Sequence, residues 1–249
     1  MNINKQYSLT ITPTSTLVTL IALAILLRLG FWQLQRADEK QQRLQDIATK
    51  QAKQAIGLDA IEWLQNEADV PVEFAGRVNL QQVFLLDNRI VNGKVGFEVV
   101  TPVSTDSGVI LVNWGWIEGT GYRDQLPVIP FTELGVVDNQ LMNFKGVTWS
   151  PSKNVFIRET AVSDGQWPKV IQEIDIKYME TLLGVASLPI LVALELPNQE
   201  LFLNNHKPVV MPPEKHIGYA VQWFGLAIGC VMVFLFASLK KRKDGSRAD

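Results

Sequence analysis

The chain has 249 residues, of which 47% are hydrophobic, and its formal net charge is −2 at neutral pH. Because the charge is nearly balanced and no basic stripe lies outside a C-terminal cluster, the composition argues against nucleic-acid binding. The single cysteine, Cys230, excludes a disulfide framework, a Cys-x-x-Cys metal or redox motif, and thiol-based copper handling within one chain.

The first apolar block covers residues 13–34 and predicts a transmembrane helix. Thr12 is a suitable cap, and Pro13 suits the first helical position, where a missing N–H costs nothing. Arg28 interrupts the block, and we expect its charged end to reach toward the nearer membrane surface. Trp32 would then lie at that surface as an aromatic anchor.

A cleaved signal peptide is the alternative interpretation of this block. Only Lys5 precedes the apolar run, and no small-x-small cleavage site follows it, so the sequence favours a retained signal anchor. The first sixteen residues also lack the arginines and the amphipathic pattern of a mitochondrial transit peptide.

The segment between the two apolar blocks is long enough for one globular domain with its own core. Residues 35–67 are rich in Gln, Lys, Ala, Glu and Leu and contain no proline. This composition predicts a polar helix that continues outward from the first span, followed by a short helix at 58–65. The polar character is typical of a solvated face.

Strand signals begin after Pro71, where apolar and polar residues alternate. The predicted strands are 72–78, 83–86, 97–103, 109–117, 140–147, 170–174 and 188–196. Asp87-Asn88-Arg89 is expected to end the second strand, and Asn92-Gly93 predicts a tight turn. Residues 119–139 show no clear period and are interpreted as a loop.

One further helix is expected at 175–183, with Asp175 as its N-terminal cap and Gly184 ending it. The predicted fold class is therefore a membrane-anchored α+β protein, in which two transmembrane helices flank an external domain rich in antiparallel strands.

The second apolar block, 218–239, predicts another transmembrane helix, and four basic residues, Lys240–Lys243, follow it at once. Because basic residues favour the cytoplasmic side, this tail decides the orientation, although basic residues beyond the first span argue mildly the other way. The predicted topology is 1–12 cytoplasmic, 13–34 transmembrane, 35–217 periplasmic, 218–239 transmembrane and 240–249 cytoplasmic. The expected setting is a bacterial inner membrane.

The chain lacks the usual signatures of enzymes: a Gly-x-Ser-x-Gly elbow, a His-Glu-x-x-His helix and a phosphate-binding glycine-rich loop. We therefore predict no enzymatic activity. Asp87 with Arg89 could position a ligand, but a salt bridge at a strand end is the favoured interpretation. Residues 113–116 are interpreted as a packing motif. The chain has two histidines, and His206 is interpreted as a loop residue.

His216 differs because it lies where the chain enters the second apolar block. A neutral imidazole can bind a metal or haem iron through one nitrogen while a hydrogen bond holds the other. Tyr219 and Trp223 follow at helical spacing and could flank a flat apolar ligand. The alternative, which the spacing alone favours, is an ordinary aromatic belt at the membrane surface.

Four stretches of the sequence resemble the surfeit locus protein 1 family. They are Leu29-Gly30-Phe31-Trp32-Gln33-Leu34-Gln35-Arg36, Leu86-Asp87-Asn88-Arg89 with Gly93, Gly96 and Thr101-Pro102, Ile110-Leu111-Val112-Asn113-Trp114-Gly115-Trp116, and His216-Ile217-Gly218-Tyr219-Ala220-Val221-Gln222-Trp223-Phe224. Two spans enclosing one external domain is also the family's topology. Trp114 is a departure, because it stands where the family usually carries arginine.

The resemblance implies an assembly factor for cytochrome c oxidase that helps haem a reach the catalytic subunit. It marks His216 as the suspected ligand of the haem iron, with Trp32, Tyr219 and Trp223 lining an apolar slot between the spans. The implied partners are the oxidase catalytic subunit, haem a synthase and membrane lipid. The alternatives are a protein that holds oxidase subunits together without binding haem, and a membrane-anchored periplasmic enzyme.

Overall fold

The computed structural model describes residues 7–9, 11–60, 68–122, 125–150, 161, 165–197, 200–205 and 209–241. The chain forms two compact units, each described by itself below. The helix-pair unit comprises Met1–Gln45 with Val209–Asp249, and the strand-rich unit comprises Asp46–Pro208.

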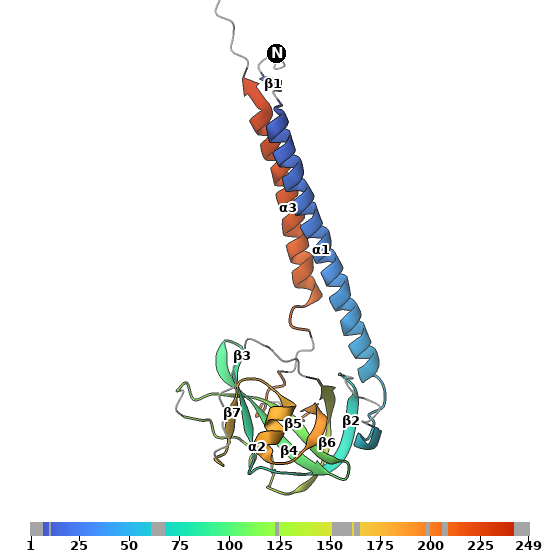
Figure 1. Ribbon diagram of the computed structural model, residues 1–249, viewed down its shortest axis with the longest axis vertical. Coiled ribbons are helices and arrows are strands. Elements are labelled where there is room, and N and C mark those ends of the chain that lie inside the picture. Colours follow the sequence, from blue (N-terminus) through green and yellow to red (C-terminus); the bar gives the residue numbers. More distant parts are fainter. Residues whose placement is uncertain are drawn as a thin grey trace, which may run out of the picture. The chain divides into compact units, whose positions relative to one another are not determined.

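The helix-pair unit is built from two antiparallel helices, α1 (Pro13–Gln51) and α3 (Pro213–Ser238), which lie side by side (Figure 1). The continuation of α1 past the first apolar block confirms the polar helix expected there. Strand β1 (Tyr7–Leu9), just before α1, pairs antiparallel with β9 (Leu239–Lys241), which follows α3. The described ends of the chain therefore lie at the same end of the helix pair.

The two helices contact each other through stripes of residues spaced alternately by three and four. On α1 the stripe comprises Thr16, Thr19, Leu23, Leu26, Gly30, Gln33 and Ala37, and on α3 it comprises Pro213, His216, Ala220, Trp223, Ala227, Cys230 and Phe234. This is the seven-residue repeat of coiled-coil packing, which keeps one seam of each helix against the other. Most of the other apolar side chains of the two helices are exposed.

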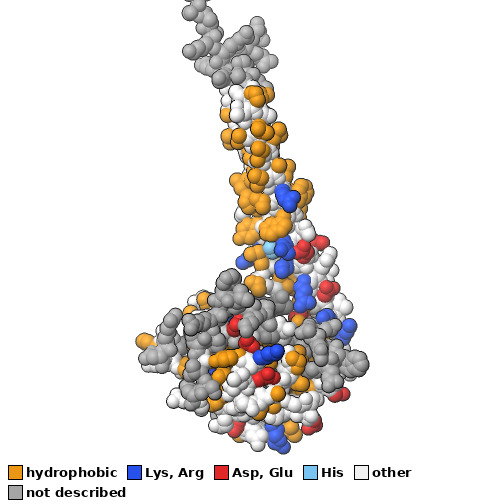
Figure 2. All heavy atoms as spheres, viewed as in Figure 1, with side chains coloured by type: hydrophobic (Ala, Val, Ile, Leu, Met, Phe, Trp, Pro, Cys, Tyr) orange, Lys and Arg blue, Asp and Glu red, His pale blue; other side chains and the backbone are white. Residues whose placement is uncertain are grey.

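Both helices are long and apolar enough to cross a membrane. Only 6% of the apolar window of α1 and 11% of that of α3 is buried, whereas the core helix of a soluble protein would be mostly buried. Figure 2 shows hydrophobic side chains gathered over the helix pair. These features fit a membrane-anchored protein.

The strand-rich unit contains a sheet that closes on itself. Its strands are β2 (Pro71–Val78), β3 (Phe84–Val91), β4 (Lys94–Thr105), β5 (Gly108–Glu118), β6 (Leu141–Trp149), β7 (Lys169–Ile171) and β8 (Ser187–Leu194). Strands β2–β6–β8–β5–β4 form the ring, because β4 also pairs with β2, and β3 and β7 extend the sheet beyond β4. The pairs β5–β8 and β3–β7 are parallel, while the other pairs are antiparallel. This confirms the predicted α+β fold class.

The sheet separates two apolar cores. Ile110, Val112 and Trp114 of β5 belong to the core inside the ring, whereas Leu111 belongs to the core beneath helix α2 (Ile176–Leu183). Successive side chains of a strand point to opposite faces, so β5 is buried on both sides. The described part of the loop at 119–139 has no helix or strand, as predicted, yet it contributes to the inner core.

One local prediction is wrong, and another falls mostly outside the described residues. Strand β3 does not end at Asp87: a bulge between Leu86 and Arg89 lets it continue to Val91, with Asn88 at φ 58°. Asparagine tolerates this left-handed conformation, and the extra residue is absorbed without losing the pairing to β4. Where a helix was expected at 58–65, residues 58–60 form a single 3₁₀ turn, and 61–67 lie outside the described residues.

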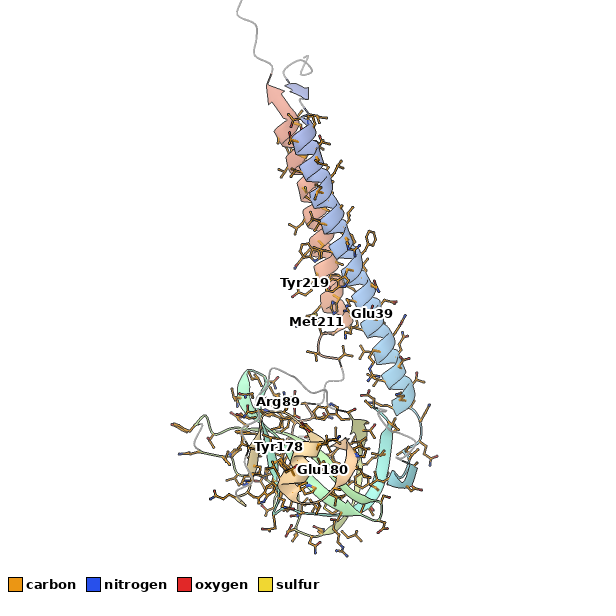
Figure 3. The ribbon with its side chains drawn as sticks, in the orientation of Figure 1. Glu39, Arg89, Tyr178, Glu180, Met211 and Tyr219 are labelled. Atoms are coloured by element: carbon orange, nitrogen blue, oxygen red, sulfur yellow. The ribbon has the colours of Figure 1, made fainter. Side chains whose placement is uncertain are left out.

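The caps of α2 are as predicted. The side chain of Asp175 accepts a hydrogen bond from the backbone N–H of Tyr178, and Gly184 ends the helix at φ 74°. Glu180 of the same helix, labelled in Figure 3, accepts a hydrogen bond from the backbone N–H of Ser187 (2.7 Å), which ties α2 to β8. The helix is thereby fixed at both ends over the second core.

Replacing Asp175 with alanine is expected to lower the free energy of unfolding of the strand-rich unit by about 1 kcal/mol, because the first turn of α2 loses its acceptor. Asp175→Asn keeps an acceptor oxygen and should retain most of that stability. Urea unfolding of the full-length protein in mild detergent measures both. Equal losses in the two variants would attribute the effect to the charge and contradict a role for the cap.

Candidate functional site

His216 lies on the contact stripe of α3, in the first turn of that helix. Its side chain is 8% exposed, and its Nδ1 atom lies 2.7 Å from Oε1 of Gln33 on α1. Proline at the start of α3 fixes the helix origin, and helical spacing then turns His216 toward α1. The histidine that the sequence singled out is thus buried between two helices.

The other ring nitrogen of His216, Nε2, is buried and has no hydrogen-bond partner among the described residues. A buried polar atom without a partner is uncommon in folded proteins and calls for a specific explanation. Because a carbonyl oxygen can only accept, the contact with Gln33 places the ring proton on Nδ1 and leaves a lone pair on Nε2. A nitrogen in this state is able to ligate a metal.

The three aromatic residues predicted to accompany His216 occupy different faces. Trp223 lies on the contact stripe of α3 and is partly buried. Tyr219 is 43% exposed and Trp32 is 46% exposed, and both lie off the stripes (Figure 3 labels Tyr219). The structure therefore brings His216 and Trp223 to the helix contact, whereas Trp32 and Tyr219 face outward.

A glycine of α1, one turn before Gln33, makes room for an aromatic ring of α3. A Cβ atom on Gly30 would lie 2.5 Å from the ring of Phe224, so only glycine fits at this point of α1 without a shift of that ring. Phe224 also meets Phe31 edge to face, with ring centroids 5.3 Å apart. Small residues at helix contacts allow this approach within a membrane.

The charged end of the first motif lies one turn further along α1. The guanidinium of Arg36 lies 5.7 Å from the ring of Trp32 and forms an ion pair with Glu39 (2.7 Å). The hydrogen bond from Arg36 lowers the pKa of Glu39. Trp32 is thus covered on one side by a cation of its own helix.

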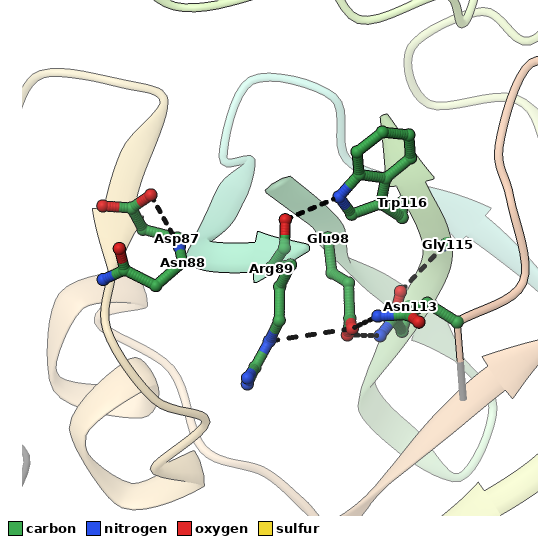
Figure 4. Close-up of polar contacts among 8 residues, drawn as sticks. Asp87, Asn88, Arg89, Glu98, Asn113, Gly115 and Trp116 are labelled. Carbon is green, nitrogen blue, oxygen red and sulfur yellow. Dashed lines mark hydrogen bonds and ion pairs between the residues drawn. The ribbon is translucent and has the colours of Figure 1, made fainter. Parts of the chain in front are cut away.

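A second polar cluster lies within the strand-rich unit, around the buried carboxylate of Glu98 (Figure 4). Its oxygens accept hydrogen bonds from the side-chain amides of Asn113 (2.8 Å) and Asn205 (3.1 Å). Asn113 in turn accepts a hydrogen bond from the backbone N–H of Gly115. A buried charge is tolerated when donors surround it in this way.

Arg89 is the cation of this cluster, and the predicted salt bridge between Asp87 and Arg89 is wrong. Nε of Arg89 lies 3.7 Å from Oε1 of Glu98, and it is buried without a hydrogen bond to any residue that the structure describes. Asp87 instead accepts from the backbone N–H of Asn88 and from the side chain of Gln172. The bulge in β3 explains the difference, because it turns Arg89 toward β4.

Trp114 points into the core of the ring, where it packs against Phe131, Phe144 and Phe202. Its indole N–H donates to the hydroxyl of Thr101 (2.8 Å). The side chain at this position is 2% exposed, so it has a packing role in this chain. The interpretation of the motif at 113–116 as packing holds for Trp114, while Asn113 adds the contact to Glu98 that the spacing did not reveal.

An open hollow of about 500 Å³ lies at the hairpin of β3 and β4. Val95, Phe97 and Leu126 supply apolar lining, and an ion pair between Lys94 and Glu118 (2.7 Å) lies at the same hollow. Among the described residues, no group of three or more His, Cys, Asp and Glu side chains is placed to hold a metal ion.

Comparison with known proteins covers nearly the whole chain. The sequence model of the SURF1 family matches residues 20–228. A SURF1-like protein of Rickettsia felis is 26% identical over 234 residues, which is 89% of this chain and 95% of the relative. The SURF1-like protein of Rickettsia bellii is 26% identical over 249 residues, covering 93% of this chain and 92% of the relative.

The matched range contains all four stretches that carried the resemblance, including Gln33, Arg89 and His216. The match, the two candidate spans and the enclosed strand-rich unit agree with one another. The chain therefore belongs to the SURF1 family, whose members are assembly factors for cytochrome c oxidase, and its role lies in oxidase assembly.

Proposed function

We propose that this protein binds haem a through Nε2 of His216 at the outer face of the membrane and passes it to the oxidase catalytic subunit. The observation that carries the proposal is the buried Nε2 atom without a hydrogen-bond partner. Family membership supplies the setting, which is oxidase assembly. The haem is cargo in this proposal, so the chain's own residues only bind, orient and release it.

The donor set fits such a ligand. A neutral imidazole nitrogen is an axial ligand in many haem proteins. Because Gln33 occupies Nδ1, only Nε2 of His216 is left to bind. Trp223, on the same stripe, offers apolar surface for a flat ligand. Trp32 and Tyr219 face outward in this structure.

Binding requires a local rearrangement, because Nε2 is covered by packed side chains in this structure. The contact stripes hold the helices together by side-chain packing, which side-chain rotations can open locally. The strand-rich unit would dock the oxidase subunit or haem a synthase, with the hollow at the β3–β4 hairpin as a candidate contact. In this proposal the strand-rich unit is periplasmic and both termini are cytoplasmic.

The test is the absorption spectrum of full-length protein purified from cells that make haem a. The wild-type protein should carry a haem absorption band, and His216→Ala should lose most of it. His206→Ala is the matched control, because it removes the other histidine of the chain, and it should keep the band. Equal haem content in the two variants would overturn the ligand assignment.

A second function is favoured by the same contact. The hydrogen bond between His216 and Gln33 joins α1 to α3, which explains the burial of the histidine without any ligand. A protein of this kind would hold oxidase subunits together without binding haem. It predicts that the wild-type protein purifies with oxidase subunits and without a haem band.

A further inference from the structure

The hydrogen bond between Gln33 and His216 joins the two sequence motifs that lie farthest apart, one in α1 and one in α3. The atoms in contact are Oε1 of Gln33 and Nδ1 of His216, at 2.7 Å. The amide oxygen has no proton to give, so Nδ1 must donate. Gln33 thereby selects one of the two neutral forms of the imidazole.

The reverse arrangement is disfavoured by the surroundings of the ring. If the amide group of Gln33 were turned, its NH₂ would donate to Nδ1, and the ring proton would move to Nε2. Nε2 is buried, and no acceptor lies within reach of it among the described residues. A buried N–H without an acceptor is rarer in proteins than an acceptor without a donor, so the form with the proton on Nδ1 is the favoured one.

The neighbouring residues hold Gln33 in place. Gly30 and Ala37, one turn to either side of it on α1, are buried at the contact stripe, and Ala220 is buried one turn after His216 on α3. Small side chains at these positions leave room beside Gln33 and His216 at the contact between the helices. At this separation a glutamine is long enough to reach across the seam to the histidine.

We propose that Gln33 is the positioning residue for His216 as a haem ligand: it holds the proton on Nδ1 and aims the lone pair of Nε2. The inference rests on the function proposed above. In metal sites, a ligating histidine almost always donates its other N–H to a nearby acceptor, which fixes the ring and raises its basicity. Gln33 supplies that acceptor from the opposite helix.

The experiment combines two readouts on full-length protein in lipid nanodiscs. Long-range proton–nitrogen NMR correlations of ¹⁵N-histidine-labelled protein report which ring nitrogen carries the proton. With two histidines in the chain, the spectrum of His216→Gln assigns the signals. Titration with added haem, followed by absorption, gives the dissociation constant of each variant.

Gln33→Leu removes the acceptor, so the ring proton of His216 should no longer lie on Nδ1 alone. The haem affinity should fall about 10- to 100-fold. Gln33→Glu keeps an acceptor oxygen and should retain both the Nδ1–H form and tight binding. Gln35→Leu is the matched control, because Gln35 lies on the same helix and bonds only to Glu39 among the contacts described for it. It should behave as wild type in both measurements.

The outcomes separate the two proposals. If wild-type protein binds haem and Gln33→Leu changes neither the ring proton nor the affinity, the positioning role is overturned while the ligand role of His216 survives. If the affinity falls equally in Gln33→Leu and Gln35→Leu, the loss comes from removing any polar side chain of α1, and the positioning role of Gln33 is also overturned. If wild-type protein binds no haem, the proposed function fails, and the positioning role falls with it.

Discussion

Replacing Trp114 with alanine is expected to lower the free energy of unfolding of the strand-rich unit by about 3–5 kcal/mol, the usual cost of removing a large buried aromatic side chain. The indole lies between Phe131, Phe144 and Phe202, with ring centroids 5.2 to 6.1 Å away. Truncation would leave a cavity inside a closed ring of strands, which cannot collapse easily because its backbone is paired on both sides.

Two further substitutions separate the contributions of Trp114. Trp114→Phe keeps an aromatic ring but leaves the hydroxyl of Thr101 without its donor, so a smaller loss than that of alanine is expected. Trp114→Arg would bury a guanidinium among three phenylalanine rings and should destabilise the fold at least as much as alanine. Urea unfolding of the full-length protein in mild detergent, followed by near-ultraviolet circular dichroism, ranks the three variants.

The ranking also bears on the departure of this chain from its family pattern. If Trp114→Arg were tolerated as well as Trp114→Phe, the position would have access to solvent or to a buried anion, and its assignment to the apolar core would be contradicted. If arginine is not tolerated, the space between the three phenylalanine rings accepts an indole but not a guanidinium. No cation then acts at this position.

Features that depend on neighbours in the sequence were predicted correctly. The apolar blocks, the alternation in β2 and the cap at Asp175 are local patterns, and each appears in the structure where it was expected. The Asn92-Gly93 turn is confirmed by positive φ values at both residues. Local propensity and burial agree at these positions, so the sequence alone was sufficient.

Features that depend on distant residues were missed. The sheet closes through the pairs Arg77↔Ser104 and Val78↔Val103, and no pattern of apolar and polar residues in the sequence indicates this pairing. The bulge that turns Arg89 toward β4 is not visible in the sequence pattern either. The loop at 119–139 has no period, although its Phe131 packs inside the ring. Tertiary packing decides all three, and a single sequence does not display it.

At the candidate ligand site, too, the local feature was predicted from the sequence and the long-range contact was missed. The sequence singled out His216 from its place at the start of an apolar helix, but its partner Gln33 lies 183 positions away. The outward orientation of Tyr219 was missed because helical spacing relates Tyr219 to His216 and says nothing about which of them faces α1. Which residues of α3 face α1 becomes clear only from the structure, in which His216, Ala220 and Trp223 lie on the contact stripe.

Removing the carboxylate of Glu98 is the second large effect that we expect. Glu98→Ala takes the acceptor from Asn113 and Asn205 and the counter-charge from Arg89, so a loss of about 3–5 kcal/mol in the free energy of unfolding is predicted. Glu118→Ala is the matched control. Its ion pair with Lys94 is shorter, at 2.7 Å against 3.7 Å, but it is exposed, and it should cost no more than about 1 kcal/mol.

A double-mutant cycle with Arg89→Ala then shows where the stability of the Glu98 cluster arises. If the carboxylate stabilises the fold mainly through the two amide hydrogen bonds, the losses of Glu98→Ala and Arg89→Ala should add within about 0.5 kcal/mol. If the ion pair matters, the double variant should be more stable than the sum of the single losses predicts. Because Nε of Arg89 is buried at 3.7 Å from the carboxylate without a hydrogen bond, we expect such coupling. Equal losses for Glu98→Ala and Glu118→Ala would contradict the burial argument, because burial of the carboxylate would then have no effect on the cost of removing it.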